Sequence, residues 1–241
     1  MNMNRFHRWY CRSSHWRRTV REHLLPWALA GVDLGDHLLE IGPGPGLTTD
    51  VLRTRVAAMT VVEIDRELAD RLSQRMAGTN VSVIEADATA IPLPEASVSA
   101  VVCFTMLHHV PSAAMQDRLL KEAARVLSPG GVLAGSDSTT SWWLRQVHRG
   151  DTLVPVDPDS FPSRLAEAGF EQIKVSRAPG AFRFRARKPP LGAGARLRSF
   201  AQHSDDRAME RNPGYGDVLD AQDRQEGRRG GVAAPARADA R

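Results

Sequence analysis

Acidic residues stand at the ends of three successive apolar runs, and a glycine cluster follows the first of them. Glu40 precedes the segment Gly42-Pro43-Gly44-Pro45-Gly46, which separates an expected strand from an expected helix. Glu63 ends the next run, 17 residues after Gly46, and Asp87 follows the third. Glycines let the backbone turn sharply and approach a ligand closely. Carboxylates accept hydrogen bonds from ligand hydroxyl and amino groups, so this spacing indicates a binding site.

Each of these features also has a plain structural interpretation. The glycines can form a simple turn, Glu63 can be an exposed strand-end acid, and Asp87 can cap a turn. Together they favour a nucleoside site. Glu63 can accept both hydroxyls of a ribose, and Asp87 can accept from an adenine amino group while neighbouring backbone N–H groups meet the ring nitrogens. The carboxyl ends of parallel strands share one edge of a sheet, where open α/β sheets bind ligands.

The glycine spacing selects among nucleoside ligands. It is Gly-x-Gly-x-Gly, and Leu47 stands where the dinucleotide pattern Gly-x-Gly-x-x-Gly has its third glycine. The phosphate-binding pattern Gly-Lys-Ser/Thr is absent from the loop. A carboxylate at Glu40 does not favour a pyrophosphate but suits an ammonium group. S-adenosylmethionine has an ammonium, a sulfonium, a ribose diol and an adenine, and we expect it as the cofactor.

The elements that must position these residues alternate between strand and helix, and they predict a parallel sheet covered by helices on both faces. The last two apolar runs flank Ala178-Pro179-Gly180 and predict a hairpin that closes one edge of the sheet. The expected strands are 37–41, 59–64, 81–86, 98–104 and 132–135, the expected helices are 47–53, 66–76, 112–127 and 160–168, and the expected hairpin strands are 170–177 and 181–187.

Five segments between residues 36 and 187 resemble the successive motifs of class I S-adenosylmethionine-dependent methyltransferases. They are Glu40-Ile41-Gly42-Pro43-Gly44-Pro45-Gly46, Val62-Glu63-Ile64-Asp65, Glu85-Ala86-Asp87-Ala88, Leu107-His108-His109-Val110 and Leu127-Ser128-Pro129-Gly130-Gly131. The resemblance implies an α/β, Rossmann-like, seven-stranded and mostly parallel sheet whose last strand is antiparallel. The cofactor-binding residues that it implies are Glu40, Gly42, Gly44, Gly46, Glu63, Ile64, Asp87, Ala88 and Phe104.

Methyl transfer from a sulfonium is an in-line displacement, so positioning carries much of the catalysis. A side-chain base is needed only where the nucleophile must first lose a proton. His108 and His109 follow the fourth strand and are the candidates for such a base, with shaping of the cofactor pocket as the alternative role. No metal is expected, because adjacent histidines point apart and no acid–histidine triad follows.

The sequence says less about the methyl acceptor. The glycine loop and Val61-Val62-Glu63-Ile64-Asp65 also resemble ribosomal RNA adenine dimethyltransferases, which carry an Asn-x-Pro-Tyr-type motif after strand four. This chain has Cys103-Phe104-Thr105-Met106-Leu107 there, which counts against stacking of a flipped adenine. We therefore expect a small-molecule acceptor, with nucleic acid an unlikely partner. An RNA methyltransferase and a non-catalytic S-adenosylmethionine-binding protein are the alternatives.

The two ends of the chain differ in composition from its middle. Residues 1–30 carry a net charge of +5, residues 31–176 of −7 and residues 177–241 of +6, which add to the +4 of the 241 residues. We expect a helical arm or lid over 1–35, the cofactor-binding domain over 36–188, and a largely disordered basic tail over 189–241, whose few apolar residues cannot offset the entropy of ordering.

The arm pattern places Trp16, Val20, Leu24 and Trp27 on one face of a helix, and Ser13 or Ser14 can cap its start. Arg17-Arg18 resembles a twin-arginine signal, but Pro26 interrupts the apolar run that follows. We expect the arm to lie over the carboxyl edge of the sheet and not to be needed for the core. We expect it to cover the acceptor together with loop 136–159, and the aromatic residues concerned are Trp9, Tyr10, Trp16, Trp27, Trp142 and Trp143. Ordinary packing of the tryptophans onto the domain is the alternative role.

The cysteine count and the length of the apolar runs limit the cellular locations that we expect for the protein. Two cysteines, Cys11 and Cys103, cannot form a disulfide framework or a four-cysteine zinc site. No apolar run approaches the roughly 18 residues of a membrane-spanning helix. A reducing, cytoplasmic location is therefore expected, and the sequence leaves the oligomeric state open.

Overall fold

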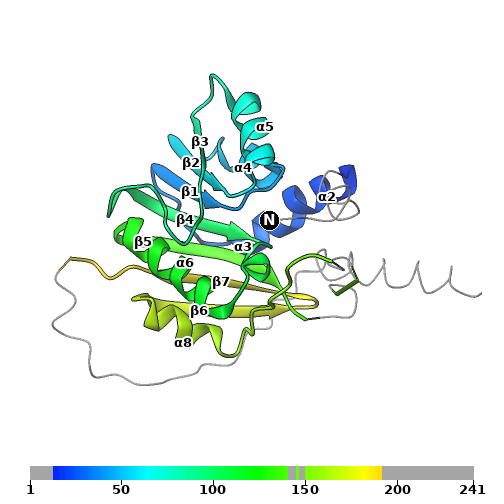
Figure 1. Cartoon of the computed structure of the whole chain (residues 1–241). Coiled ribbons are helices and arrows are strands. Elements are labelled where there is room, and N and C mark those ends of the chain that lie inside the picture. Colours follow the sequence, from blue (N-terminus) through cyan, green and yellow to red (C-terminus); the bar gives the residue numbers. More distant parts are fainter. Residues whose placement is uncertain (1–12, 141–144, 147–149, 192–241) are drawn as a thin grey trace, which may run out of the picture.

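The computed structural model describes residues 13–140, 145–146 and 150–191. Its centre is a seven-stranded sheet in the order β3-β2-β1-β4-β5-β7-β6 (Figure 1). The strands are β1 (His37–Ile41), β2 (Ala58–Glu63), β3 (Val81–Glu85), β4 (Val98–Phe104), β5 (Leu127–Ser138), β6 (Glu171–Ala178) and β7 (Ala181–Arg187). The helices are α2 (Ser14–Thr19), η1 (Val20–Leu24), α3 (Leu25–Ala28), α4 (Leu47–Leu52), α5 (Arg66–Met76), η2 (Leu107–His109), α6 (Ala113–Val126) and α8 (Phe161–Glu167).

The strand register brings the predicted acidic strand ends to one edge. Strands β1 to β5 are parallel, and Ile41 at the end of β1 lies level with Val62 on β2 and Cys103 on β4. Glu63, the last residue of β2, lies level with Glu85 at the end of β3. The loops that follow these strands therefore all begin at the carboxyl edge of the sheet, where ligand sites of open α/β sheets form.

The hairpin of β6 and β7 forms the side edge of the sheet opposite β3, as the sequence predicts. Strand β7 pairs antiparallel with β5, and β6 pairs antiparallel with β7 at the edge. The mostly parallel, Rossmann-like fold with an antiparallel last strand is thereby confirmed. Strand β5 is longer than the expected strand 132–135, because the segment Pro129-Gly130-Gly131 is part of the strand and does not precede it. The Gly130 N–H donates to the carbonyl of Lys188, and the Lys188 N–H donates to that of Gly131.

One face of the sheet is covered by α6 and α8. Helix α6 begins at the cap Ser112, whose hydroxyl accepts from the Met115 N–H, as expected. Its apolar face buries Leu119, Ala123 and Val126 against a cluster that includes strand residues of β1, β4 and β5. Phe161 of α8 contacts Phe182 and Phe184 of β7 edge-on. Burial of these apolar side chains holds the antiparallel end of the sheet to its parallel part.

The other face is covered by α4, α5 and the N-terminal helical segment. Ser13 is the cap of that segment, since its Oγ accepts from the Trp16 N–H at 3.0 Å. The helix widens to a π-turn in η1, just before Pro26, which has no N–H with which to continue the i→i−4 ladder. Figure 1 places α2 on the side of the sheet toward which β4 points.

The expectation that this arm is not needed for the core is wrong for its second half. Leu24 and Leu25 are 0% exposed and Val20 is 2% exposed. They belong to a core cluster that includes Leu38 of β1 and Val102 of β4. A helical pattern predicts a buried face but does not say what covers it, and here it is the flat face of the sheet. Arg17, Arg18 and Arg21 are exposed.

Several expectations fall on residues outside the described ranges. These are the placement of Trp9, Tyr10, Trp142 and Trp143, and the disorder expected over the tail from residue 192 onward. Within the described residues, no helix is both long enough and apolar enough to cross a membrane.

Candidate active site

The loop of residues 42–46, here called the glycine loop, leaves β1 in a tightly coiled backbone. Gly42, Gly44 and Gly46 have φ values of 63°, 55° and 78°, a left-handed region that side chains disfavour. A Cβ at Gly46 would stand 2.5 Å from Leu72 Cδ1 and from Arg75 Nη2, so this glycine lets α4 approach α5 closely. A Cβ at Gly44 would meet nothing within 4 Å. The middle of the loop therefore faces open space, which a ligand can enter.

Glu63 holds the glycine loop from the neighbouring strand. Its Oε2 accepts from the Gly44 N–H at 3.0 Å, and its Oε1 accepts from the Asp65 N–H at 2.9 Å. The residue is 6% exposed, and burial raises the pKa of Glu63 although these backbone donors oppose the rise. The carboxylate is thus oriented at the mouth of the loop, where its remaining lone pairs can accept hydroxyl groups.

Glu40 lies in β1, two residues before the loop, and is 0% exposed. The Thr49 hydroxyl of α4 donates to its Oε2 at 2.5 Å. Its Oε1 is buried without a hydrogen-bond partner among the described residues. Burial raises the pKa of Glu40 to about 7, and the hydroxyls of Thr48 and Thr49 offset part of that rise. A buried carboxylate oxygen without a partner is costly, which a cationic ligand or an ordered water can relieve.

The predicted adenine end combines an exposed apolar side chain with an acid. Ile64, next to Glu63, is 42% exposed, one of only two large hydrophobic residues exposed among those described. Asp87 is half-buried, and its Oδ1 accepts from the Thr89 N–H at 2.8 Å, so it also has the capping role that its position allows. The Ala86 N–H donates to the Glu63 carbonyl at 3.0 Å, which ties the segment before Asp87 to β2.

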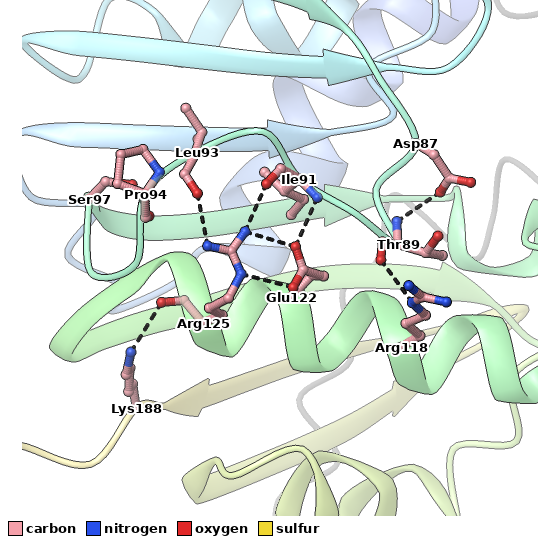
Figure 2. Close-up of polar contacts among 10 residues, drawn as sticks. All are labelled: Asp87, Thr89, Ile91, Leu93, Pro94, Ser97, Arg118, Glu122, Arg125 and Lys188. Atoms are coloured by element: carbon pink, nitrogen blue, oxygen red, sulfur yellow. Dashed lines mark hydrogen bonds and ion pairs between the residues drawn. The ribbon is translucent and has the colours of Figure 1, made fainter.

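Helix α6 fixes the loop that carries Asp87 and Ala88 (Figure 2). Arg118 Nε donates to the carbonyl of Thr89 at 3.1 Å. Glu122 accepts from the Ile91 N–H at 2.8 Å, and Arg125 donates to the carbonyls of Ile91 and Leu93 at 2.7 and 2.8 Å. Arg125 also pairs with Glu122, which lowers the pKa of that carboxyl. The sequence gives no signal for this anchoring, since the partners are about 30 residues apart.

The segment after β4 turns sharply beneath the glycine loop. Phe104 is 6% exposed and packs in the core cluster on the α4 side. Thr105 has a φ of 49°, rare for a residue with a side chain, and its N–H donates to the Ser136 carbonyl at 2.8 Å. The side chain of Met106 then lies within 3.3 Å of the place where a Gly42 Cβ would stand. A contact of Phe104 with cofactor stays a prediction.

His108 forms a buried pair with a residue that sequence reasoning missed. Its Nδ1 is hydrogen-bonded to Oδ1 of Asp137, and its backbone N–H donates to Asp137 Oδ2 at 3.1 Å. The two residues are 2% and 0% exposed. The His109 ring stands 4.3 Å from the His108 ring, centroid to centroid. Asp137 lies near the carboxyl end of β5, and this strand-end position is the signal that could have found it.

The geometry orders the predicted site residues into one strip along the carboxyl edge. Glu40, the glycine loop and Glu63 adjoin one another, and Asp87 and Ala88 are tied to β2 beside them. The partner of His108, Asp137, is on β5, which β1 and β4 separate from β2, the strand of Glu63. In the part of the chain that the structure describes, no group of three or more His, Cys, Asp or Glu side chains is placed to hold a metal.

This sheet order with a glycine loop after β1 and an acid at the end of β2 defines the class I S-adenosylmethionine-dependent methyltransferase fold. Residues 39–135 match the family model described as a methyltransferase domain. This match and the fold are consistent with the class I S-adenosylmethionine-dependent methyltransferase superfamily, and they imply S-adenosylmethionine as the cofactor.

Curated relatives include proteins that act on different kinds of molecule. The ribosomal RNA small subunit methyltransferase A of Leptothrix cholodnii is 32% identical over 60% of this chain and 60% of its own length. The 27-O-demethylrifamycin SV methyltransferase of Amycolatopsis mediterranei is 34% identical over 57% of this chain and 54% of its own length. The chain thus spans somewhat more than half the length of these relatives.

Solved structures support the fold. A chain in the complex of the Haloferax volcanii Trm112 methyltransferase activator with a methyltransferase superposes with a TM-score of 0.61 at 16% identity, over 78% of this chain and all of that one. An S-adenosylmethionine-dependent methyltransferase from Mesorhizobium loti gives a TM-score of 0.58 at 17% identity, over 68% of this chain and 96% of that one. At these identities the likeness concerns the fold alone.

Proposed function

We propose that this protein transfers a methyl group from S-adenosylmethionine to a small-molecule acceptor. The observation that carries the cofactor proposal is the buried Oε1 of Glu40, which has no hydrogen-bond partner among the described residues and belongs to the residue two positions before the glycine loop. When bound, S-adenosylmethionine supplies an electrophilic methyl on a sulfonium and an ammonium group that suits a carboxylate. The residues present fit this ligand.

Each part of the strip has a role in holding the cofactor. Glu63 accepts the ribose hydroxyls while it holds the Gly44 N–H, so the loop and the sugar share one anchor. Ile64, half-exposed beside it, offers an apolar surface to a base. Asp87 accepts from the adenine amino group through the oxygen that does not cap Thr89. The ties from α6 hold the loop of Asp87 in place, so that little ordering is left to cofactor binding.

His108 is the residue best arranged to take a proton from a hydroxyl acceptor. Asp137 accepts from or shares the proton at Nδ1 and so fixes the ring. Nε2 then is the nitrogen that receives the acceptor proton. Because the pair is buried, the aspartate also stabilises the imidazolium that forms when the proton arrives. The alternative role, shaping of the pocket, predicts that the histidine can be replaced without loss of turnover.

The acceptor class follows from what stands after β4. A base flipped out of RNA needs a flat aromatic surface on which to stack. Phe104, the aromatic residue at this position, is packed in the core, and Thr105 and Met106 follow it. This favours a small molecule over an adenine in RNA. The relative that methylates 27-O-demethylrifamycin SV acts on such a molecule, whereas the ribosomal RNA relative does not.

The helix α2 extends on the carboxyl-edge side of the sheet, so we propose that it forms one wall of the acceptor site. Arg17 and Arg18 of this helix are exposed, whereas Thr19 is buried. Leu24 and Leu25, in the helical segments that follow α2, are buried in the core and tie this part of the chain to the sheet.

The test is an acceptor screen with methyl-labelled cofactor. The full chain is incubated with cell extract, and label is counted in RNA, protein and small-molecule fractions. We expect label in the small-molecule fraction, and its loss in Glu63→Gln, with Glu167→Gln of the exposed α8 surface as the control. Label confined to RNA overturns the acceptor proposal. If calorimetry shows binding of S-adenosylhomocysteine but no fraction carries label, the non-catalytic alternative is favoured. If the protein binds NAD tightly and does not bind S-adenosylhomocysteine, the cofactor proposal is overturned.

A further inference from the structure

A hollow of about 240 Å³ lies at the amino end of the parallel strands, away from the glycine loop. Val132, near the start of the buried part of β5, lines it. Asp137, at the opposite end of that strand, is five residues further on, which is about 16 Å at about 3.3 Å per strand residue. The hollow is therefore a separate place from the candidate active site.

Cations dominate the lining of this hollow. Lys174 of β6 and Arg185 and Arg187 of β7 line it, together with Gln172 and the backbone of Gly31, and no acidic residue does. None of these three cations has a carboxylate within ion-pair distance among the described residues. Glu171 lies in register with Arg187 but outside the lining.

The strand register forces two of the cations together. Lys174 lies directly opposite Arg185 across the β6–β7 pair. Residues opposite each other in an antiparallel pair project on the same face with Cβ atoms about 5 Å apart, and like charges in such positions repel. A bound anion relieves this repulsion, which destabilises the folded protein when no anion is present.

Backbone carbonyls hold the two guanidinium groups at the rim. Arg187 Nη1 donates to the Gly130 carbonyl at 2.8 Å, and Arg185 Nη1 lies 3.4 Å from the Ala30 carbonyl. Each guanidinium has five N–H donors, so most of them remain for a ligand. Anchored guanidinium groups lose less entropy on binding an oxyanion than free ones do.

A strained residue completes the lining. Gln172 has a φ of 51°, a conformation that costs of order 1 kcal/mol or more for a residue with a side chain. It lies at the irregularity where three steps along β6, from Glu171 to Lys174, match two steps along β7. Such bulges redirect side chains and are common beside functional sites, and at this one Gln172 lines the hollow.

We propose that this hollow binds a small phosphate-bearing anion, held by Lys174, Arg185 and Arg187 with Gln172 as an additional donor. Its volume lies below the roughly 300 Å³ at which pockets for drug-sized ligands begin, so it fits a phosphate or a small phosphorylated compound. Arginine forks match phosphate geometry with paired hydrogen bonds. The site is independent of the proposed methyl transfer.

The test uses inorganic phosphate and pyrophosphate with the full chain, and calorimetry measures both affinities. We expect saturable binding with one site per chain, unchanged by S-adenosylhomocysteine. The variant Lys174→Gln/Arg185→Gln is expected to bind at least tenfold more weakly. The control Arg18→Gln/Arg71→Gln removes the same charge at exposed positions of α2 and α5 and is expected to bind normally. If the double variant is poorly folded by circular dichroism, the exposed Lys174→Gln alone serves.

Two outcomes overturn the proposal. One is equal, weak phosphate affinity in the wild type, the site variant and the control, which is a response to overall charge. The other is tight binding of a ten-nucleotide RNA, lost in the site variant, in a protein that does not bind phosphate or pyrophosphate. That result would make the hollow part of a nucleic-acid surface.

Discussion

Replacement of Glu40 by Gln isolates the energetic cost of the buried carboxylate. The side chain keeps its shape and an oxygen that can accept from Thr49. It loses the ability to ionise. Because the carboxylate is fully buried, burial raises the pKa of Glu40 to about 7 from an ordinary 4.5. This difference between the folded and ordinary pKa values corresponds to about 3 kcal/mol in the free energy of unfolding, since each pKa unit represents about 1.4 kcal/mol.

The sign of the pH dependence follows from the direction of this change. A carboxyl whose pKa is higher in the folded protein contributes stability below about pH 4.5, and that contribution is lost as the pH rises through about 7. The free energy of unfolding of the wild type, minus that of Glu40→Gln, should therefore fall by about 3 kcal/mol between pH 4.5 and pH 8. Any constant cost of the amide cancels in this comparison.

The assay is urea unfolding of the cofactor-free protein at half-unit pH steps. Glu167→Gln, on the exposed surface of α8, is the control, and its curve should run parallel to the wild type. Calorimetry with S-adenosylmethionine then adds a second readout. The ammonium favours ionised Glu40, so wild-type affinity should rise with pH up to about 7, whereas Glu40→Gln should bind weakly at every pH.

Parallel stability curves for the wild type and Glu40→Gln would refute the reasoning. They would mean that Glu40 has the same pKa in the folded and unfolded chain, and hence that a water or a neighbouring group already satisfies Oε1. If the stability difference depends on pH but wild type and Glu40→Gln bind the cofactor equally well, Glu40 is a buried carboxyl with a raised pKa that does not contact the ligand.

Three further predictions concern other parts of the molecule. Glu63→Gln should weaken S-adenosylhomocysteine binding at least tenfold in calorimetry, because a charge-assisted hydrogen bond contributes about 1.5–3 kcal/mol; unchanged affinity would mean that Glu63 braces the loop without touching the ligand. Leu24→Ala should lower the free energy of unfolding by about 2–5 kcal/mol, whereas Arg21→Ala, exposed in the same segment, should change it little; equal effects would place the segment outside the core. Asp137→Asn should reduce turnover and shift its pH profile while cofactor affinity is kept, and an unchanged profile would assign His108 a structural role.

Local sequence determined much of the fold and of the cofactor strip. The glycine spacing after β1 and the acids at the ends of β2 and β3 are properties of short segments, and their side of the sheet follows because parallel strands end at one edge. The alternation of apolar runs and helical faces likewise predicted the parallel sheet and the closing hairpin, since the periods of strand and helix differ.

The tertiary structure alone decided which distant residues meet. The pairing of His108 with Asp137 joins positions 29 residues apart through the register of β4 and β5, and the ties from α6 to the Asp87 loop depend on how that helix lies on the sheet. An amphipathic pattern could show that Val20 and Leu24 are buried but not that the sheet buries them. Lys174 lies opposite Arg185 because of a one-residue bulge in β6. Pairing register and helix placement are set by the packing of the whole domain, so no local segment encodes them.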